Sequence, residues 1–224
     1  MNQFSRMLNL INEEELLKIS NTKILLVGLG GVGASCLNQL VRCGFSNITI
    51  VDHDIIDITN LNRQLITNHS NIGQKKVIVA KKYALDINPK CNINAIDKFL
   101  LKEDINNLDK DYDYIIDCCD TVTTKLALVL FAKKNNIKII SSCGTGNRLN
   151  PTKLIITDIY KTKNDPLAKV LRNLLRKNNI DSLKVITSEE LPIKSQDYIS
   201  SVSFVPNTAG IYLAYTIFDD IIKK

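Results

Sequence analysis

Lys23-Ile-Leu-Leu-Val-Gly28-Leu-Gly30-Gly31-Val-Gly33 is the stretch that decides the fold, because an apolar run passes directly into a glycine-rich turn. The run predicts a buried strand over 23–27, and the residues after the turn predict a helix over 31–43. A strand, a turn of this type and a helix, in this order, form a nucleotide-binding fingerprint, whereas the glycines alone would be a weak signal. The alternative is that these glycines serve only the turn and the packing of the helix and bind no nucleotide. We predict that a nucleotide lies against the turn formed by Gly28, Gly30, Gly31 and Gly33.

An acidic residue ends the second strand that we predict, over 47–51. Asp52 follows the glycines by about twenty residues, where a carboxylate reaches the ribose hydroxyls of a nucleotide. Later residues favour ATP over NAD, because a triphosphate attacked at its α-phosphorus needs cations against the developing charge. Arg63 offers a planar fork and Lys76 a point charge, although each alone could be a solvated surface charge. The nucleotide contacts expected in this region are Asp52, Asp54, Asn60, Arg63, Gln64 and Lys76.

The rest of the chain alternates between strands and helices. Alternation predicts an α/β fold, Rossmann-like, with a mostly parallel sheet flanked by helices and ligands at the carboxyl ends of the strands. After residue 150 the rhythm changes without a linker. We therefore expect one domain over 1–224, with a nucleotide-binding core over 1–150 and an extension of further strands and helices over 151–224. The other expected strands are 92–96, 113–117, 137–142, 153–160 and 183–188, and the other helices are 75–87, 121–135, 166–177 and one from about 207.

Composition agrees with one α/β domain. The 224 residues are 45% apolar, which suffices for a sizeable core. No apolar run approaches the ~18–20 residues that span a bilayer, so we expect no membrane contact. The N-terminal stretch lacks the apolar core of a signal peptide. Six cysteines occur without a Cys-x-x-Cys pair, which favours reduced thiols in a cytoplasmic protein over disulfides or a zinc site.

Further motifs accompany the fingerprint. One set comprises Asp52-His-Asp54, Asn60-Leu-Asn62-Arg63-Gln64, Gly73-Gln-Lys75-Lys76 and Asp117-Cys-Cys-Asp120. With this set the sequence resembles the adenylating superfamily of ubiquitin-activating enzymes and of the ThiF- and MoeB-like adenylyltransferases of the thiamine and molybdopterin pathways. A second set comprises Phe4-Ser-Arg6, Ile87-Asn-Pro89, Thr157-Asp-Ile-Tyr-Lys161-Thr162, Asp165-Pro-Leu-Ala-Lys169 and Ser203-Phe-Val-Pro206 with Ala209-Gly210. With both sets the chain is similar over essentially its whole length to the tRNA threonylcarbamoyladenosine dehydratases.

The resemblance implies ATP-dependent dehydration of threonylcarbamoyladenosine in tRNA, through an acyl-adenylate and closure of a ring. It implies catalytic roles for Arg6, Arg63, Lys76 and Asp120. In the superfamily the aspartate matching Asp120 helps to hold the Mg²⁺ that accompanies ATP, although its place before a helix also fits an N-cap. The arginine matching Arg6 reaches the ATP of a partner subunit in relatives, which implies a homodimer. The expected RNA partner is tRNA with the modified adenosine next to the anticodon, and a sulfur-relay or helper protein is a further partner left open.

A second interpretation is adenylation of a ubiquitin-like sulfur carrier at its C-terminal glycine. Those adenylyltransferases usually bind zinc through two Cys-x-x-Cys pairs in the C-terminal part, and ubiquitin-type activators carry a thioester cysteine well past the ATP-site aspartate. Here the last cysteine is Cys143, so neither feature is found. Cys118, Cys119 and Cys143 fall near the expected site, but free cysteine is more often a small buried hydrophobe than a nucleophile. A redox or sensor module is a third class, disfavoured because no separate domain for hydride transfer is visible.

Positive charge is concentrated in the extension. The net charge is +6, and residues 153–184 hold eight lysines and arginines against three aspartates. Beside an adenylation site, such a basic surface fits a polyanion such as tRNA, with a solvated helix face as the alternative. In the helix over 166–177 we expect a buried stripe of Leu167, Val170, Leu171, Leu174 and Leu175, which leaves Lys169, Arg172, Arg176 and Lys177 on the outer faces.

Overall fold

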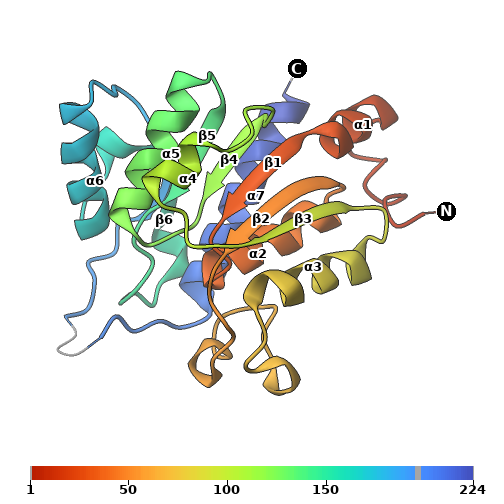
Figure 1. The fold of residues 1–224 in the computed structure, drawn as a ribbon, viewed down its shortest axis with the longest axis horizontal. Helices are drawn as coiled ribbons and strands as arrows, with labels where there is room; N and C mark the ends of the chain where they lie inside the picture. Colours follow the sequence, from red (N-terminus) through yellow and green to blue (C-terminus); the bar gives the residue numbers. More distant parts are fainter. Residues whose placement is uncertain (1, 195–197, 224) are drawn as a thin grey trace.

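A computed structural model describes residues 2–194 and 198–223 and contains a seven-stranded sheet in the order β3-β2-β1-β4-β5-β7-β6 (Figure 1). Neighbouring strands pair in parallel, except that β6 is antiparallel to β7. The predicted α/β fold with a mostly parallel sheet is therefore confirmed, and both strands of the extension join the sheet of the core. The strands are β1 (Lys23–Val27), β2 (Asn47–Asp52), β3 (Asn92–Asp97), β4 (Tyr114–Asp117), β5 (Lys138–Ser142), β6 (Leu154–Asp158) and β7 (Lys184–Ser188).

Helices lie on both faces of the sheet. Within the described residues, none is both long and apolar enough to cross a bilayer. Two short helices, α1 and α4, were not expected from the sequence; α1 begins with a capping box in which Asn12 and Glu15 exchange hydrogen bonds. The α-helices are α1 (Glu13–Asn21), α2 (Gly31–Arg42), α3 (Lys76–Ile87), α4 (Lys102–Asn106), α5 (Val122–Lys134), α6 (Pro166–Lys177) and α7 (Phe204–Ile222), and the 3₁₀ turns are η1 (Ile58–Asn60), η2 (His69–Asn71), η3 (Pro151–Lys153) and η4 (Ile159–Lys161).

The interior strand β1 is apolar from Ile24 to Val27 because both of its faces are covered there. Ile24 and Leu26 belong to the hydrophobic cluster that β1 forms with α2, α3 and α7. Leu25 and Val27 belong to the cluster on the opposite face, with α4 and α5. Successive side chains of a strand point to opposite faces, so a strand buried on both sides reads as a continuous apolar run. The run that predicts β1 from the sequence thus has a direct structural cause.

The C-terminal helix α7 packs closely on α2, the helix that follows the glycine-rich turn. A Cβ atom on Gly210 would lie 2.3 Å from the carbonyl oxygen of Val32, so this approach requires glycine. The helix begins at Phe204, three residues before the predicted start. Pro206 falls in its first turn, where its missing N–H leaves no intrahelical hydrogen bond unmade. The close packing places the start of α7 beside the nucleotide fingerprint.

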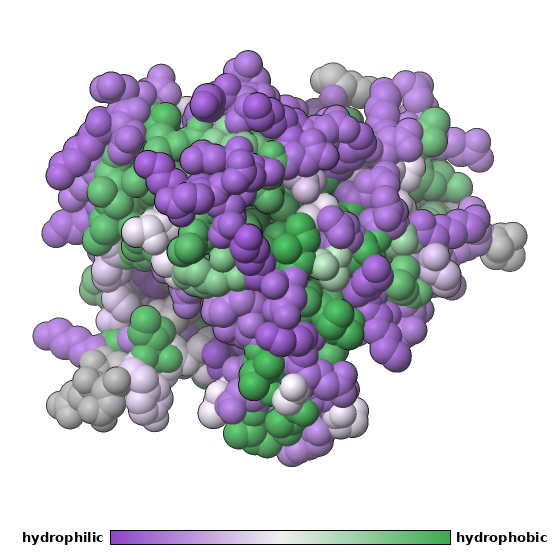
Figure 2. All heavy atoms as spheres, viewed as in Figure 1, coloured by the Kyte–Doolittle hydropathy of each residue, from purple (hydrophilic) through white to green (hydrophobic). Residues whose placement is uncertain are grey.

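Helix α6 differs from its predicted stripe. Val170 is 49% exposed, whereas Ala168, Leu171 and Leu175 are buried. Arg172 is half-buried, and its Nη1 donates to the carbonyl of Thr162 at 3.0 Å and to that of Ile159 at 3.2 Å. Its guanidinium therefore supports the turn before the helix, and the prediction of a free outer charge at Arg172 is wrong. Hydrophilic side chains dominate the surface over α5 and α6 (Figure 2).

Candidate active site

The carboxyl ends of β1, β2, β4 and β5 surround a cavity of about 540 Å³. The topology brings these ends together because the chain reverses direction along the sheet between β1 and β4, which is where ligands bind in open α/β sheets. The predicted nucleotide contacts gather here, while Gly33 lies behind the turn and Arg6 lies outside the cavity. Predicted residues that line the cavity are Gly28, Gly30, Gly31, Asp52, Asp54, Asn60, Arg63, Gln64, Lys76 and Asp120.

The glycine-rich turn depends on two glycines for different reasons. Gly28 has a φ of +93°, which favours glycine, and a Cβ there would lie 2.9 Å from the backbone of Cys118. A Cβ on Gly33 would lie 1.8 Å from the carbonyl oxygen of Gly28. Gly30, in contrast, has open space in front of it and faces the cavity. The turn therefore leaves room for a ligand at Gly30, at the start of α2.

Asp52 ties the end of β2 to this turn. Its Oδ2 accepts the N–H of Leu29 at 2.6 Å, and its Oδ1 accepts the N–H of Asp54 at 2.8 Å. Each carboxylate oxygen can accept a second hydrogen bond, so Asp52 can still accept one from a ligand hydroxyl. The side chain thus shapes the turn and remains available at the cavity.

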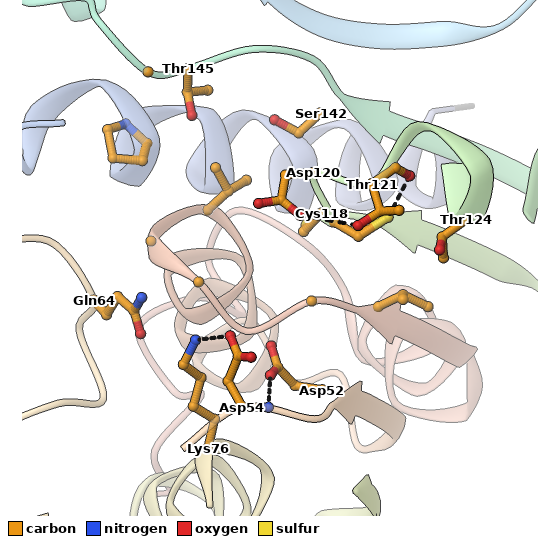
Figure 3. Close-up of a pocket in the computed structure, with 18 of the residues that line it drawn as sticks. Asp52, Asp54, Gln64, Lys76, Cys118, Asp120, Thr121, Thr124, Ser142 and Thr145 are labelled. Carbon is orange, nitrogen blue, oxygen red and sulfur yellow. Dashed lines mark hydrogen bonds and ion pairs between the residues drawn. The ribbon is translucent and has the colours of Figure 1, made fainter. Parts of the chain in front are cut away.

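Lys76 and Asp54 form an ion pair at the cavity (Figure 3). The Nζ of Lys76 lies 2.7 Å from Oδ2 of Asp54, and the side chain of Lys76 is 6% exposed. Partial burial works against the charge of Asp54, but the hydrogen bond and the charge of Lys76 outweigh it and lower the pKa of this carboxyl. The pair presents an ammonium with a defined position toward the cavity.

Arg63 and Gln64 approach from the loop between β2 and α3. The Nη1 of Arg63 donates to the carbonyl of Thr59 at 2.9 Å and to Oδ1 of Asn62 at 3.0 Å. The carbonyl of Arg63 accepts from Nδ2 of Asn207 at 3.1 Å, so the start of α7 holds this loop. Gln64 is 5% exposed, and its Oε1 has no hydrogen-bond partner among the described residues. A buried acceptor without a partner is costly, which points to a ligand donor at this position.

Asp120 lies on the surface of the cavity and does not cap α5. The N-cap is Thr121, which forms no side-chain capping bond. The carboxylate of Asp120 is exposed, and among the described residues it accepts one side-chain hydrogen bond, at 3.4 Å from the hydroxyl of Thr121. The N-cap alternative is therefore wrong. A carboxylate open to the cavity fits Mg²⁺, which uses one or two protein carboxylates together with phosphate oxygens and water.

The three cysteines near the site are poor nucleophiles. Burial raises the pKa of Cys143 to about 12, and it also raises those of Cys118 and Cys119. A thiol whose pKa lies far above neutral carries almost no thiolate, the reactive form. They line the cavity as small apolar groups.

A fully buried ion pair supports the loop that carries Asp120. The Nζ of Lys125 lies 3.0 Å from Oδ2 of Asp117 and donates to the carbonyl of Ser142 at 2.6 Å. Oδ1 of Asp117 accepts from the N–H of Cys119 at 3.2 Å. Asp117 and Lys125 thus join the ends of β4 and β5, which gives Asp117 a structural role.

Sequence reasoning placed Cys143 near the site but predicted no ligand contact on the far side of the cavity. The turn Gly144–Thr145–Gly146 lines it there, together with Ser142. Two buried side chains, Arg148 and Asp165, hold the turn from behind. Asp165 stands in one of the dehydratase motifs, whereas nothing in the sequence marks Arg148.

The fold and this cavity define an adenylating enzyme of the ThiF family, whose pattern matches residues 4–206; the chain belongs to that family. The chain is similar to tRNA threonylcarbamoyladenosine dehydratase of Bacillus subtilis, at 37% identity over 243 aligned residues, which cover 100% of this chain and 96% of that protein. The protein of the same name from Haemophilus influenzae is 38% identical over 75% of this chain, which spans 65% of that relative's length. The structure of Escherichia coli tRNA N6-threonylcarbamoyladenosine dehydratase, TcdA, in complex with AMP matches with a TM-score of 0.93 at 29% identity, covering 98% of this chain and 93% of TcdA. The resemblance drawn from the motifs is thereby confirmed.

Proposed function

We propose that this protein is an ATP-dependent tRNA threonylcarbamoyladenosine dehydratase. The supporting observation is one cavity that combines a glycine-rich turn, the cations Arg63 and Lys76 and the open carboxylate of Asp120, in a chain similar along its whole length to dehydratases of that name. The substrate is the threonylcarbamoyl group on an adenosine of tRNA.

The reaction has two steps. A carboxylate oxygen of the threonyl group bonds to the α-phosphorus of ATP as the bond from that phosphorus to pyrophosphate breaks. A nucleophilic atom of the same side chain then attacks the acyl carbon, and AMP leaves with the carboxylate oxygen. The ring closes with net loss of water, because AMP is a far better leaving group than hydroxide. Proximity within one substrate supplies the second step without an enzyme nucleophile, in agreement with the protonated thiols at the site.

The residues at the ATP side have three roles in this proposal. Arg63 and Lys76 stabilise the charge that builds on the phosphate oxygens. Asp52 and Gln64 accept hydrogen bonds from the nucleotide, and Asp120 holds the Mg²⁺. When bound, that ion neutralises charge on the leaving pyrophosphate.

A homodimer and a tRNA-binding surface complete the proposal. Arg6 is exposed and lies outside the cavity of its own chain, which fits a contact with the ATP of a partner subunit. The loops between β2 and α3 expose Ile55, Ile58, Leu65 and Ile72. Apolar surface is visible at the lower edge of Figure 2, where Figure 1 places these loops, and apolar surface of this kind fits a second copy of the chain. The basic segment 153–184 fits tRNA phosphates. A cytoplasmic location stays a prediction, and no described residue points to a sulfur-relay partner.

Pyrophosphate release tests the function directly. Purified protein, ATP and Mg²⁺ are incubated with tRNA that carries threonylcarbamoyladenosine, with the same tRNA lacking the modification, or with a sulfur-carrier protein that ends in diglycine. The proposal is supported if pyrophosphate is released with the modified tRNA and with neither of the other two substrates, and if EDTA abolishes this release. Release only with the carrier would replace it by the adenylyltransferase interpretation.

A further inference from the structure

The turn Gly144–Thr145–Gly146 presents hydrogen-bond donors that the protein does not use. In the described part of the chain, neither the hydroxyl nor the N–H of Thr145 makes a hydrogen bond. Thr145 lines the cavity, and Figure 3 shows it with Ser142 on one side of the glycine-rich turn and Asp54 and Lys76 on the other. Unpaired donors at a cavity wall select for an acceptor in the ligand. One residue thus offers two donors to the half of the cavity away from the Lys76–Asp54 pair.

Buried Arg148 determines how this turn is oriented. Arg148 is 2% exposed, and its Nη1 donates to the carbonyls of Gly144 and Gly146. Because the peptide group is planar and trans, the N–H of Thr145 points opposite to the carbonyl of Gly144. The guanidinium therefore turns the N–H of Thr145 away from the protein interior.

Asp165 anchors the same turn to α6. Its Oδ2 accepts the N–H of Gly144 at 3.0 Å and the hydroxyl of Thr187 at 2.8 Å. Its Oδ1 accepts the N–H of Ala168 at 3.0 Å and so caps the helix. A Cβ on Gly144 would lie 3.1 Å from Oδ1 of Asp165 and 3.4 Å from Nη1 of Arg148, so the two buried groups adjoin at this glycine. The turn is held at both ends by side chains that do not reach the cavity.

We propose that Gly144–Thr145–Gly146 is the subsite that binds the carboxylate of the substrate, with Thr145 as its contact residue and with Arg148 and Asp165 as positioning residues. The inference rests on the proposed function and names the group recognised there. The nucleotide fingerprint occupies the ends of β1 and β2, so the end of β5 remains for the second reactant. That reactant must bring a carboxylate, an acceptor that matches two unpaired donors.

The charge of the reacting group predicts the kinetic signature. The carboxylate carries its full charge when it binds and loses charge as its oxygen attacks phosphorus. Donors that contact it therefore stabilise the bound substrate at least as well as the transition state. Thr145→Val removes the hydroxyl at nearly constant shape and should raise KM for the modified tRNA about 10- to 100-fold, as expected for a hydrogen bond to a charged group, with kcat not lowered. Thr145→Ser should restore KM.

The experiment compares two probes in three proteins, which are the wild type, Thr145→Val and a control variant. The probes are the nucleoside N6-threonylcarbamoyladenosine and its carboxylate methyl ester, each measured as an inhibitor of pyrophosphate release with modified tRNA. Wild type should prefer the acid about tenfold or more, and Thr145→Val should lose most of that preference. Thr123→Val is the matched control, because Thr123 is exposed on α5 and does not line the cavity; it should keep the preference. ATP affinity, measured by calorimetry, should be equal in all three.

Asp165→Asn tests the positioning role. An Asn oxygen can still cap α6, but the amide nitrogen cannot accept the N–H of Gly144. The variant should show the same rise in KM and the same loss of acid preference, with unchanged ATP affinity. If this variant fails to fold, the measurements on Thr145→Val by themselves decide whether the turn binds the carboxylate.

Three results would overturn the inference. They are an undiminished acid preference in Thr145→Val, a wild type that binds acid and ester equally, and a loss of ATP affinity in Thr145→Val, which would assign the turn to the nucleotide. A wild type that releases no pyrophosphate with modified tRNA overturns the proposed function itself, and the inference with it.

Discussion

The Nζ of Lys76 lies 2.7 Å from Oδ2 of Asp54, and the two side chains differ sharply in exposure, at 6% for Lys76 and 47% for Asp54. The ammonium is therefore positioned in the protein while its partner remains in contact with water. Loss of Lys76 leaves behind a carboxylate that water can solvate, so the penalty for an unpaired buried charge is avoided. The lysine can thus be replaced without unfolding the chain.

Lys76→Met should slow pyrophosphate release about 10²- to 10³-fold, in the range seen when a transition-state donor is removed. Arg63→Ala should act in the same direction. The control is Lys75→Met, because Lys75 is exposed, pairs with Asp97 at 3.2 Å and does not line the cavity. Thermal unfolding of each variant verifies the fold. Near-normal release in both active-site variants would refute the assignment.

The thiols at the site should resist alkylation at neutral pH. Burial raises the pKa of Cys143 to about 12 and also raises that of Cys118. Because thiolate forms only as pH rises toward these values, labelling by iodoacetamide should speed up about tenfold per pH unit between pH 7 and 10. Cys118→Ala and Cys143→Ala should keep pyrophosphate release and ring closure. Mass spectrometry measures the labelling. Rapid labelling at pH 7 that is coupled to loss of turnover would instead support covalent catalysis by one of these cysteines.

The buried pair of Asp117 and Lys125 should contribute strongly to stability. Lys125→Met leaves the Asp117 carboxylate buried without a positively charged partner, which should cost about 3–5 kcal/mol in the free energy of unfolding. Complete burial opposes the charge of Lys125, but Asp117 outweighs it and raises the pKa of the lysine. A raised pKa in the folded state means stability that is present below about pH 10.4 and lost as pH rises beyond it. Urea unfolding at pH 8 and pH 11 should show this loss in wild type and not in Lys125→Met.

The exposed lysines of the extension should set the salt dependence of tRNA binding. Lys163, Lys169 and Lys177 are exposed, and their joint replacement by Ser should reduce the slope of log affinity against log salt by up to about three. The KM for tRNA should rise with kcat nearly unchanged. Arg172→Ala is the contrasting variant: its guanidinium bonds to Thr162, so it should lower the unfolding temperature and leave the slope in place. An unchanged slope in the triple variant would place tRNA elsewhere.

Mixed subunits can show whether Arg6 acts on a partner's ATP. Arg6→Ala and Lys76→Met should each be nearly inactive as pure proteins. After unfolding and refolding together, a mixed dimer contains one site with Lys76 from one subunit and Arg6 from the other. Activity should then return to about a quarter of wild type when the two are mixed equally, because half of the dimers are mixed and each has one intact site. No recovery despite mixed dimers in native mass spectrometry would place both groups in one chain's site.

The sequence by itself determined the strands of a mostly parallel sheet, the family and the side of the cavity where we predict nucleotide contacts, because each of these depends on local order along the chain. An apolar run before Gly28 and an acidic residue after the next strand suffice to predict that side of the cavity. The carboxyl ends of paired parallel strands lie at the same edge of the sheet, so the residues that follow them lie close together. The tertiary structure alone decided the opposite wall and the roles of the buried charges. Arg148 binds the carbonyl of Glu190, and Asp165 binds the N–H of Gly144, which are contacts between segments far apart in sequence. Such contacts leave no periodic trace, and for the same reason Arg172 looks like a free surface charge until the neighbouring turn packs against it.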